Sequence, residues 1–360
     1  MAHAHSSLLL LGMGNPLLDI SAEVDESLLA KYKLDANNAI LADASHTPLY
    51  QEMIAHKDVV YVAGGATQNS IRGAQWLLPA GSTAYIGCVG QDHFAGKLEE
   101  AARADGVDTH YMVQSEAPTG TCAVLITGKG AARSLVANLS AAEKYQVSHL
   151  QQPETWALVE AAKYYYIGGF FLTVSPPSIM AVARHAAEHN KVFCMNLSAP
   201  FLSQFFREPL DAAAPYWDYL FGNETEAATY AETHGWEERD VKAVAMKIAA
   251  LPKANAARKR VVVFTQGSDD VVIATVDDAG KAFAVDHPII PVPKDKIVDT
   301  NGAGDAFVGG FLAELALGKD IDACVKAGVW AAHIVIQVSG PVYPKITKPA
   351  DFSQLTYQQV

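Results

Sequence analysis

Apolar residues along this chain follow two spacings, one typical of buried strands and one typical of helices. Short continuous apolar runs that end in glycine or a polar residue predict buried strands. These runs cover residues 8–11, 83–90, 164–171, 192–197, 219–221 and 261–265. A spacing of three to four residues predicts helices that open near Thr67, span residues 93–104, and follow Asp305 with Phe307, Phe311 and Leu315 on one face.

The order of these patterns predicts the fold class. From about residue 156 onward, strand patterns alternate with helical ones, which indicates a parallel sheet covered on both faces. Residues 23–62 instead alternate short apolar and polar runs, so we expect a small β-rich insertion there. Residues 119–127 alternate like an antiparallel strand and are expected to join that insertion.

Polar or glycine residues follow several of the predicted parallel strands. They are Gly168-Gly169, Asn196-Leu197-Ser198, the segment 222–226 and Thr265-Gln266-Gly267. Because ligands of parallel sheets bind at the carboxyl ends of the strands, these residues predict one edge with binding chemistry.

Composition and charge narrow the class of protein. The 360 residues are 50% hydrophobic and 18% charged, which fits a packed soluble globule, and the length predicts one large domain with a smaller addition. A net charge of −12 argues against nucleic acid or an anionic membrane as the main partner. The run of residues 8–11 is too short for a membrane span or a signal core.

The four cysteines are far apart in the sequence and lie in apolar surroundings: Cys88, Cys122, Cys194 and Cys324. They predict buried free thiols and a reducing compartment, so we expect a cytoplasmic protein.

The segment from Asp299 to Asp305 carries the strongest chemical signal. We expect an extended run over residues 296–298, a turn through Gly302-Ala303-Gly304, and then a helix. Backbone N–H groups at a glycine-rich helix start bind anions, and the helix dipole should favour the ionised form of Asp305. A carboxylate beside an anion site predicts phosphoryl transfer. Taken alone, the short Gly-x-Gly-Asp pattern is better explained by an ordinary helix cap. The longer string and the Gly309-Gly310 pair, which indicates close backbone approach, favour the functional interpretation.

Two earlier segments carry candidate hydroxyl-binding residues. Asn15 and Asp19 are expected just past the first strand, where Asp19 can hold vicinal hydroxyls, although a turn-stabilising pair is an equal alternative. Gly64-Gly65 predicts a hinge or a close approach, and Asn69 follows at the helix start. Pro16 and the missing third glycine exclude a dinucleotide fingerprint after Gly12 and Gly14.

Other short motifs are rejected or left open. The segment from Gly90 to Lys97 has the wrong spacing for a phosphate-binding P-loop. His185, Glu188 and His189 match a zinc-peptidase pattern, but they are expected on the solvent side of their helix. Arg133 lies at a loop tip and either folds over a phosphate or is a solvated surface residue.

Six strings together resemble the ribokinase-like (PfkB) carbohydrate kinase family, and within it the adenosine kinases. They cover residues 12–21, 67–70, 169–176, 196–201, 221–226 and 299–311. The resemblance implies a three-layer α/β/α domain with a mostly parallel sheet and a small β-rich lid. The large domain would be residues 1–17, 65–116 and 138–360, and the lid would be residues 18–64 and 117–137.

The resemblance also implies ATP-dependent phosphorylation of the adenosine 5′-hydroxyl. Asp305 would be the base, with Gly302, Ala303 and Gly304 as the anion hole and Arg133 closing with the lid. Further residues would bind the substrate: Asn15, Leu17, Asp19, Gly65, Asn69, Leu135, Ala137, Leu139, Phe170 and Asn301. Asn223, Thr265 and Gly267 would bind ATP, and Asn223 with Glu226 would organise Mg²⁺ through water.

Adenosine and ATP are thus the expected small-molecule partners of a monomer, with no nucleic acid and no membrane. A K⁺ requirement, self-association and a nuclear pool are left open by the sequence. Ala39, Val329 and Trp330 depart from the family pattern, which leaves base selectivity open. A kinase of the same fold with another nucleoside or a sugar as substrate is the nearest alternative, and a catalytically inactive nucleoside-binding protein is the second.

Overall fold

The computed structural model describes residues 8–36, 39–128 and 132–356. The chain divides into two compact units. Unit 1 comprises Met1–Gly14, Gln146–Pro291 and Thr356–Val360, and unit 2 comprises Asn15–Tyr145 and Val292–Leu355. Each unit is described by itself.

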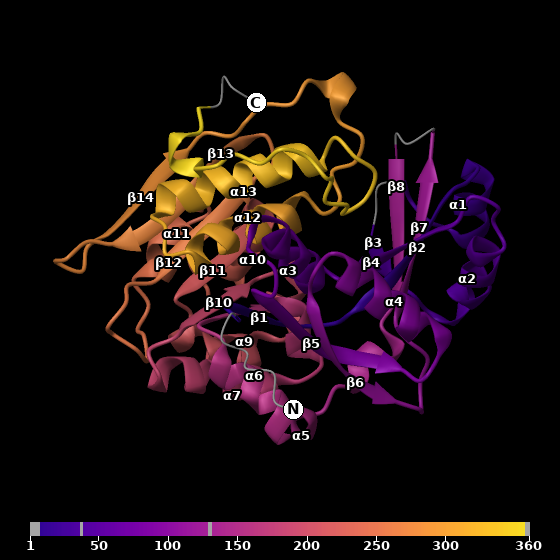
Figure 1. Ribbon diagram of the computed structural model, residues 1–360. Helices are drawn as coiled ribbons and strands as arrows, with labels where there is room; N and C mark the ends of the chain where they lie inside the picture. Colours follow the sequence, from indigo (N-terminus) through magenta and orange to yellow (C-terminus); the bar gives the residue numbers. More distant parts are fainter. Residues whose placement is uncertain (1–7, 37–38, 129–131, 357–360) are drawn as a thin grey trace. The chain divides into compact units, whose positions relative to one another are not determined.

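Unit 1 is built on a mostly parallel sheet with strand order β14-β13-β12-β11-β10-β9-β1 (Figure 1). Its parallel strands are β1 (Leu10–Met13), β9 (Tyr164–Gly168), β10 (Val192–Asn196), β11 (Tyr219–Asn223) and β12 (Val261–Gln266). Two antiparallel strands, β13 (Asp269–Val276) and β14 (Ala282–His287), complete the order. The predicted parallel strands are therefore confirmed.

The helices of unit 1 fill the connections between these strands. They are α5 (Val147–Leu150), α6 (Pro153–Ala161), η3 (Gly169–Thr173), α7 (Pro176–Glu188), α8 (Pro200–Phe205), α9 (Arg207–Ala213), η4 (Ala214–Tyr216), α10 (Glu224–Thr233) and α11 (Val241–Ala249). Three of them, α6, α7 and α8, begin with proline, whose fixed φ and missing N–H suit the first helical position.

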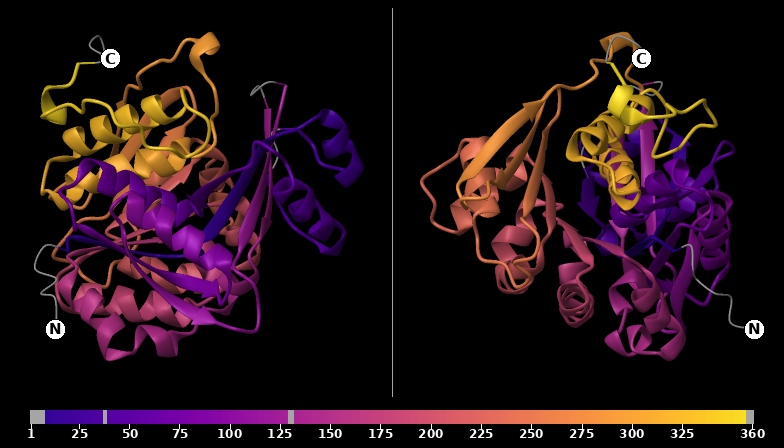
Figure 2. Two further views of the ribbon diagram at one scale, coloured as in Figure 1. Left: turned by 45° about the vertical axis from the view of Figure 1, so that its right-hand side comes forward. Right: turned by 60° about the vertical axis from the view of Figure 1, so that its left-hand side comes forward.

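Unit 2 contains a five-stranded sheet with the order β3-β8-β7-β2-β4. Its strands are β3 (Ala39–Leu41), β8 (Ala132–Asn138), β7 (Thr121–Thr127), β2 (Leu17–Glu23) and β4 (Val60–Gly64). Helices α1 (Glu26–Tyr32) and α2 (Thr47–Ile54) cover one face of this sheet, and η1 (Ala44–His46) leads into α2 (Figure 2).

The prediction of a β-rich insertion over residues 23–62 was wrong in part, because the segment also holds these two helices. Leu29 and Tyr32 on α1, and Leu49 and Met53 on α2, recur at helical spacing and pack on the sheet. The two helices are seven and eight residues long, so each shows its period for only two turns.

The second part of unit 2 consists of packed helices and a parallel strand pair. The pair is β5 (Thr83–Gly90) with β6 (Asp108–Gln114). The helices are α3 (Ala66–Leu77), α4 (His93–Ala104), η2 (Ser140–Lys144), η5 (Lys294–Lys296), α12 (Ala303–Ala316), α13 (Ile321–Val335) and η6 (Phe352–Gln354). The predicted helices near Thr67, over 93–104 and after Asp305 are confirmed.

Glycines let α12 pack closely against both α3 and α13 (Figure 1). A Cβ added at Gly309 would lie 2.6 Å from the Ser70 carbonyl oxygen of α3, and one at Gly310 would collide with the Ala327 carbonyl of α13. The close approach that these glycines indicated is thus helix packing.

The predicted extended run over residues 296–298 was wrong in part, because Lys296 ends a 3₁₀ turn and no strand forms, while Ile297 has extended backbone (φ −73°, ψ 115°). Residues 294–296 form η5, and the next strand-like signal, Ile297-Val298, is 38% and 43% exposed. Pro288, Pro291 and Pro293 precede it, and proline cannot donate a ladder hydrogen bond. Irregular chain therefore leads into α12.

The segment 340–348 of unit 2 is fastened to α3. The Tyr343 hydroxyl donates to the Asn69 carbonyl oxygen at 2.7 Å, and the Trp76 indole N–H donates to the Pro344 carbonyl at 2.9 Å. Trp76 also stacks on Trp330, which is buried. These contacts hold both ends of α3 in place, the first turn at Asn69 and the last turn at Trp76.

No helix in the described ranges combines the length and apolar character needed to span a bilayer. All four cysteines are buried free thiols, as the sequence predicted.

Candidate active site

Asp305 and Asn69 meet between two helices of unit 2. Asp305 is the third residue of α12, and Asn69 lies one turn into α3. The Asn69 amide Nδ2 donates to Asp305 Oδ2 at 3.0 Å. Asn69 is buried and Asp305 half-buried, so the carboxylate is held and still reaches the surface.

The pKa of Asp305 runs against the expectation from the helix dipole. Burial raises its pKa from the usual 3.8 to about 6, although the Asn69 hydrogen bond and the Arg72 charge lower it. Desolvation therefore outweighs the Asn69 hydrogen bond and the Arg72 charge. A carboxylate with this pKa is ionised at neutral pH and is a stronger base than an ordinary aspartate.

The turn before α12 is shaped for a close backbone approach. Gly302, the N-cap, has φ 78° and ψ −2°, a left-handed conformation that suits glycine. The Ala306 N–H makes the first helical bond, to the Gly302 carbonyl at 2.8 Å. Earlier N–H groups precede the helical ladder, and that of Ala303 contacts the Thr300 carbonyl at 3.3 Å.

Gly304 is the glycine that packing does not explain. It is exposed, its φ is not positive, and a Cβ added to it meets no described atom within 4 Å. Glycine costs helix stability at such a position. Open space beside a helix start favours the approach of a ligand at this point.

Asn15 and Asp19 pack against the two glycines before α3. A Cβ at Gly64 would collide with the Asp19 carboxylate, and one at Gly65 would collide with the Asn15 carbonyl oxygen. The sequence predicted Asp19 just past a strand end, and this was wrong. Asp19 lies inside β2, because a new strand begins at Leu17. Among the described residues, buried Asn15 Oδ1 has no hydrogen-bond partner, so it can accept a bond from a ligand hydroxyl.

Asp19 shares one face of the five-stranded sheet with apolar residues. It lies opposite Cys122, which lies opposite Ala137 on the next strand. The buried part of this apolar cluster is Leu17, Cys122, Val124 and Ala142, and Leu135, Ala137 and Leu139 pack on it half-buried. Helices α1 and α2 cover the opposite face, so this face is the one that can meet a ligand.

Arg72 and Asp105 lie behind Asn69, and the sequence did not reveal their connection. The Arg72 guanidinium donates to Asn69 Oδ1 at 3.1 Å and to Asp105 Oδ2 at 2.6 Å, with only 4% of the side chain exposed. Arg72 follows Asn69 by three residues on a helix, which was a visible signal. Asp105 is distant in sequence and gave none.

Asn223 and Glu226 in unit 1 form a reciprocal capping box at the start of α10. The Glu226 N–H donates to Asn223 Oδ1 at 2.8 Å, and the Asn223 N–H donates to Glu226 Oε2 at 3.1 Å. Burial raises the pKa of Glu226 to about 7. Each carboxylate oxygen keeps a lone pair, so the pair fits water-mediated contact with a cation better than direct ligation.

The other candidate residues of unit 1 follow the parallel strands as expected. The Thr265 hydroxyl, at the end of β12, donates to the Gly222 carbonyl of β11 at 3.4 Å. Gly267 has φ 58° in the turn between β12 and β13, which by itself explains a glycine. Phe170 in η3 is half-buried, with its ring 6.1 Å from that of Phe201.

Two residues named in the sequence analysis have side chains that the structure does not describe, and a third, Asn301, is described by its backbone hydrogen bond. Arg133 belongs to β8, and its side chain lies outside the described part of the structure, as does that of Ala39. The Asn301 N–H donates to Asp299 Oδ1 at 3.0 Å, while Asp299 Oδ2 accepts from the Gly340 N–H at 2.8 Å. Asp299 thus closes the turn before α12.

The expectation that His185 faces solvent was wrong. His185 is buried and packs its ring 5.3 Å from that of Trp156 and 4.1 Å from that of His189. Arg184, Glu188 and His189 are exposed, so these three residues and not His185 face the solvent. Packing accounts for this histidine.

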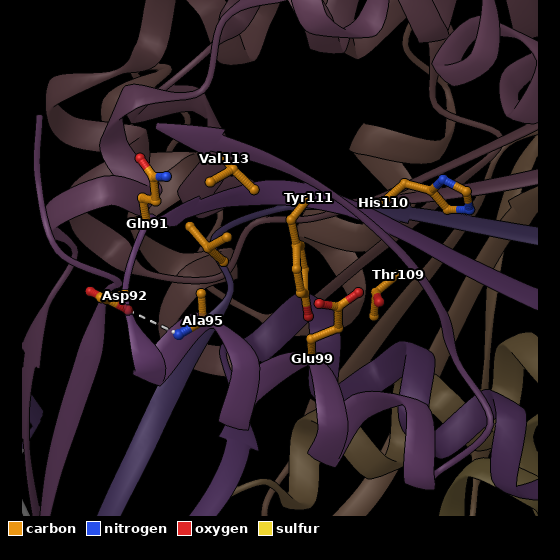
Figure 3. Close-up of a pocket in the computed structure, with 10 residues that line it drawn as sticks. Gln91, Asp92, Ala95, Glu99, Thr109, His110, Tyr111 and Val113 are labelled. Carbon is orange, nitrogen blue, oxygen red and sulfur yellow. Dashed lines mark hydrogen bonds between the residues drawn. The ribbon is translucent and has the colours of Figure 1, made fainter. Parts of the chain in front are cut away.

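A separate cavity of about 470 Å³ lies beside β6 and α4 (Figure 3). Its polar lining is already engaged: Asp92 accepts from Ala95 and Thr119, and Glu99 pairs with Arg103 at 2.8 Å. The Tyr111 hydroxyl donates to Gln68 at 2.5 Å, which links the cavity wall to α3. None of the predicted site residues lines it.

Comparison with known proteins gives one consistent family. Residues 27–348 match the model of the pfkB family carbohydrate kinases. The chain is 56% identical to adenosine kinase 2 of Arabidopsis thaliana, covering 94% of this chain and 96% of that protein. It is 47% identical to the adenosine kinase of Schizosaccharomyces pombe, covering 94% and 97%.

Solved structures agree. Anopheles gambiae adenosine kinase, in complex with P1,P4-di(adenosine-5) tetraphosphate, superposes with a TM-score of 0.85 at 48% identity over 92% of this chain and 96% of that one. Schistosoma mansoni adenosine kinase, in complex with 2-fluoroadenosine, gives 0.84 at 38% identity over 93% and 97%. The fold is therefore the ribokinase-like α/β fold with a second, smaller sheet.

Proposed function

The chain belongs to the pfkB family of carbohydrate kinases, and from this premise we propose how it phosphorylates adenosine. Its activity is the ATP-dependent transfer of a phosphoryl group to adenosine. We propose the 5′-hydroxyl as the acceptor, with AMP and ADP as products, which gives the enzyme a role in purine salvage.

The observation that carries the proposed mechanism is the Asp305 carboxylate at the start of α12. Asp305 accepts the proton of the acceptor hydroxyl as its oxygen attacks phosphorus. The hydrogen bond from Asn69 at 3.0 Å supports this role, because it orients one carboxylate oxygen and leaves the other available. A pKa of about 6 keeps this base ionised at neutral pH.

Backbone N–H groups of Gly302, Ala303 and Gly304 stabilise the charge that builds on the transferring phosphoryl group. Dipoles fixed in advance lower the barrier because they need no reorganisation during the reaction. The left-handed Gly302 and the open space at Gly304 support this assignment. Asn301, just before this turn, borders the acceptor.

The nucleoside is bound mainly by unit 2. Asp19 holds the ribose hydroxyls, and Asn15, Gly65 and Asn69 complete the polar part. Leu17, Leu135, Ala137 and Leu139 contact the purine, and the family resemblance adds Phe170 as a further proposed purine contact. The unpartnered Asn15 Oδ1 and the shared sheet face of Asp19 and Ala137 support this division. Residues 18–64 and 117–137 act as the lid, and Arg133 closes with it.

ATP and the cation are assigned to unit 1. Thr265, Gly267 and Asn223 contact ATP, and Asn223 with Glu226 holds Mg²⁺ through water. A bound Mg²⁺ would supply positive charge that neutralises the phosphates. The capping box supports this role by fixing the Glu226 carboxylate. A K⁺ requirement is included in the proposal, to be decided by activity with and without the ion. We propose a cytoplasmic monomer, and a nuclear pool stays open.

The acceptor assignment is tested with 5′-deoxyadenosine and a substrate panel. We expect 5′-deoxyadenosine to inhibit competitively with adenosine while no phosphate is transferred to it. Adenosine should be used faster than inosine, guanosine or ribose. Phosphorylation of 5′-deoxyadenosine would refute the 5′-hydroxyl assignment, and equal use of ribose would refute the purine pocket.

A further inference from the structure

Asp305 belongs to a hydrogen-bonded series of four side chains in unit 2. Asp305 accepts from Asn69 Nδ2 at 3.0 Å, Asn69 Oδ1 accepts from Arg72 Nη1 at 3.1 Å, and Arg72 Nε donates to Asp105 at 2.6 Å. This series of hydrogen bonds runs from the proposed reacting carboxylate of Asp305 to Asp105 at the end of α4.

The orientation of the Asn69 amide is decided by Arg72. An asparagine amide has an acceptor end and a donor end, whereas a guanidinium group only donates. Arg72 therefore holds the oxygen of the amide toward itself, and the NH₂ group must face Asp305. Without Arg72 the amide can rotate and present its oxygen to the carboxylate, which would repel it.

Arg72 is itself held tightly. Its side chain is 4% exposed, and Nη1 also donates to the Ala63 carbonyl at 2.5 Å. The guanidinium lies 5.6 Å from the centre of the Tyr343 ring, whose hydroxyl binds the Asn69 carbonyl oxygen at 2.7 Å. Side chain and backbone of Asn69 are thus fixed from two directions.

We propose that Arg72 is a positioning residue for phosphoryl transfer, which acts through Asn69 to aim the Asp305 carboxylate, and that Asp105 balances its charge. This inference rests on the proposed role of Asp305 as the base. It assigns a function to two residues that do not touch the substrate.

Charge supplies a readout that packing alone would not change. The Arg72 charge lowers the pKa of Asp305, and Asp105 offsets that charge. Tyr343 is another titratable group that Asp305 influences, and burial raises the pKa of Tyr343, so it stays neutral. On α13, the charged residues Asp322 and Lys326 pair with each other at 2.8 Å, and His333 lies in the last turn.

Three variants of the full chain test the proposal through the pH profile of kcat/KM for adenosine. Arg72→Gln should lower kcat by about 10- to 100-fold and move the acid limb of the profile to higher pH. Asp105→Asn should move the acid limb to lower pH, because Arg72 then acts unbalanced. Arg72→Lys should keep the limb near its wild-type position with a reduced kcat, because one ammonium group cannot replace the fork of donors.

The matched control is Arg103→Gln, which removes an arginine that pairs with Glu99 at 2.8 Å on the surface of the same unit. Its kcat and pH profile should equal those of the wild type. Thermal melting of every variant checks folding. If Arg72→Gln does not fold, Arg72→Lys and Asp105→Asn still give different expectations: an unmoved acid limb with reduced kcat for the first, and a limb shifted to lower pH for the second.

Two results would overturn the inference. Wild-type kcat and an unmoved acid limb in Arg72→Gln would remove Arg72 from the mechanism, and limbs that shift in the same direction in Arg72→Gln and Asp105→Asn would refute the charge balance. Asp305→Asn serves as the reference. Should it retain full turnover, the proposed base itself fails; should it lose turnover while Arg72→Gln does not, only the present inference fails.

Discussion

The helices α12 and α10 each carry an acidic residue at the third helical position, yet the two side chains do opposite things. Glu226 of α10 folds back onto its own N-cap, Asn223, and forms a capping box. Asp305 of α12 has Gly302 as its N-cap, which offers no side chain, and it bonds instead to Asn69 of another helix. The N-cap residue decides whether the carboxylate closes its own helix or stays available.

Burial raises the pKa of both carboxylates, to about 7 for Glu226 and to about 6 for Asp305. A raised pKa alone therefore does not mark the base. Glu226 has both oxygens engaged by Asn223, whereas a single hydrogen bond to Asp305, on Oδ2, orients it. The hydrogen-bond partners of the two carboxylates, and not their pKa values, distinguish the proposed base Asp305 from Glu226.

The largest difference in turnover between Asp305 and Glu226 variants is expected when each carboxylate is replaced by its neutral amide. Asp305→Asn should reduce kcat by about a hundredfold or more, with folding and adenosine binding nearly intact, because the Asn69 bond can persist while the base is lost. Glu226→Gln should cost less turnover and mainly raise the Mg²⁺ concentration needed. Initial rates against adenosine and against Mg²⁺ measure both, and equal losses of kcat at saturating Mg²⁺ would remove the distinction.

The pH dependence of kcat/KM gives a second test of the role of Asp305, with a smaller expected effect. Because Asp305 must be ionised, kcat/KM should rise as pH passes through about 6. At one pH unit below that value about a tenth of the base is ionised, so the rate should be about tenfold below its plateau. Asp305→Asn should abolish this limb. A limb that survives in that variant would belong to another group.

The smallest expected effects come from the glycines of α12. Gly304→Ala should stabilise the protein by about 0.5–1 kcal/mol, since alanine is the better helix former and its Cβ meets open space, while turnover falls about tenfold as the Cβ obstructs the phosphoryl group. Gly309→Ala should instead destabilise it by about 1–3 kcal/mol, because its Cβ would lie 2.6 Å from the Ser70 carbonyl. Thermal melts with rate assays separate the two, and unchanged turnover in Gly304→Ala would refute the anion hole.

The sequence predicted much of the fold because most of its elements are long and strongly patterned. The strands of unit 1 are continuous apolar runs, and α4 and α12 show several turns of one period. The short helices α1 and α2, and the irregular chain before α12, were missed. In the irregular chain before α12, Ile297 and Val298 suggested a strand that the prolines before them prevent.

The candidate site was accessible from the sequence where glycines and polar residues are neighbours. Gly64-Gly65 indicated close approach, and the structure supplies the reason in Asp19 and Asn15. The bond between Asn69 and Asp305 spans 236 positions, and Asp105 is 33 positions from Arg72, so no local pattern could reveal either. Such pairs are decided by helix packing.

The bond from Tyr343 to Asn69 joins groups 274 positions apart, across most of the polypeptide. During synthesis on the ribosome the chain emerges from its amino end, so α3 is made long before the hydroxyl that fastens it. A truncated translation product that stops before residue 343 therefore lacks this clasp, even though it already contains every residue proposed to touch adenosine or ATP. Synthesis of residue 343 is therefore the step that supplies the last of these supports for Asn69.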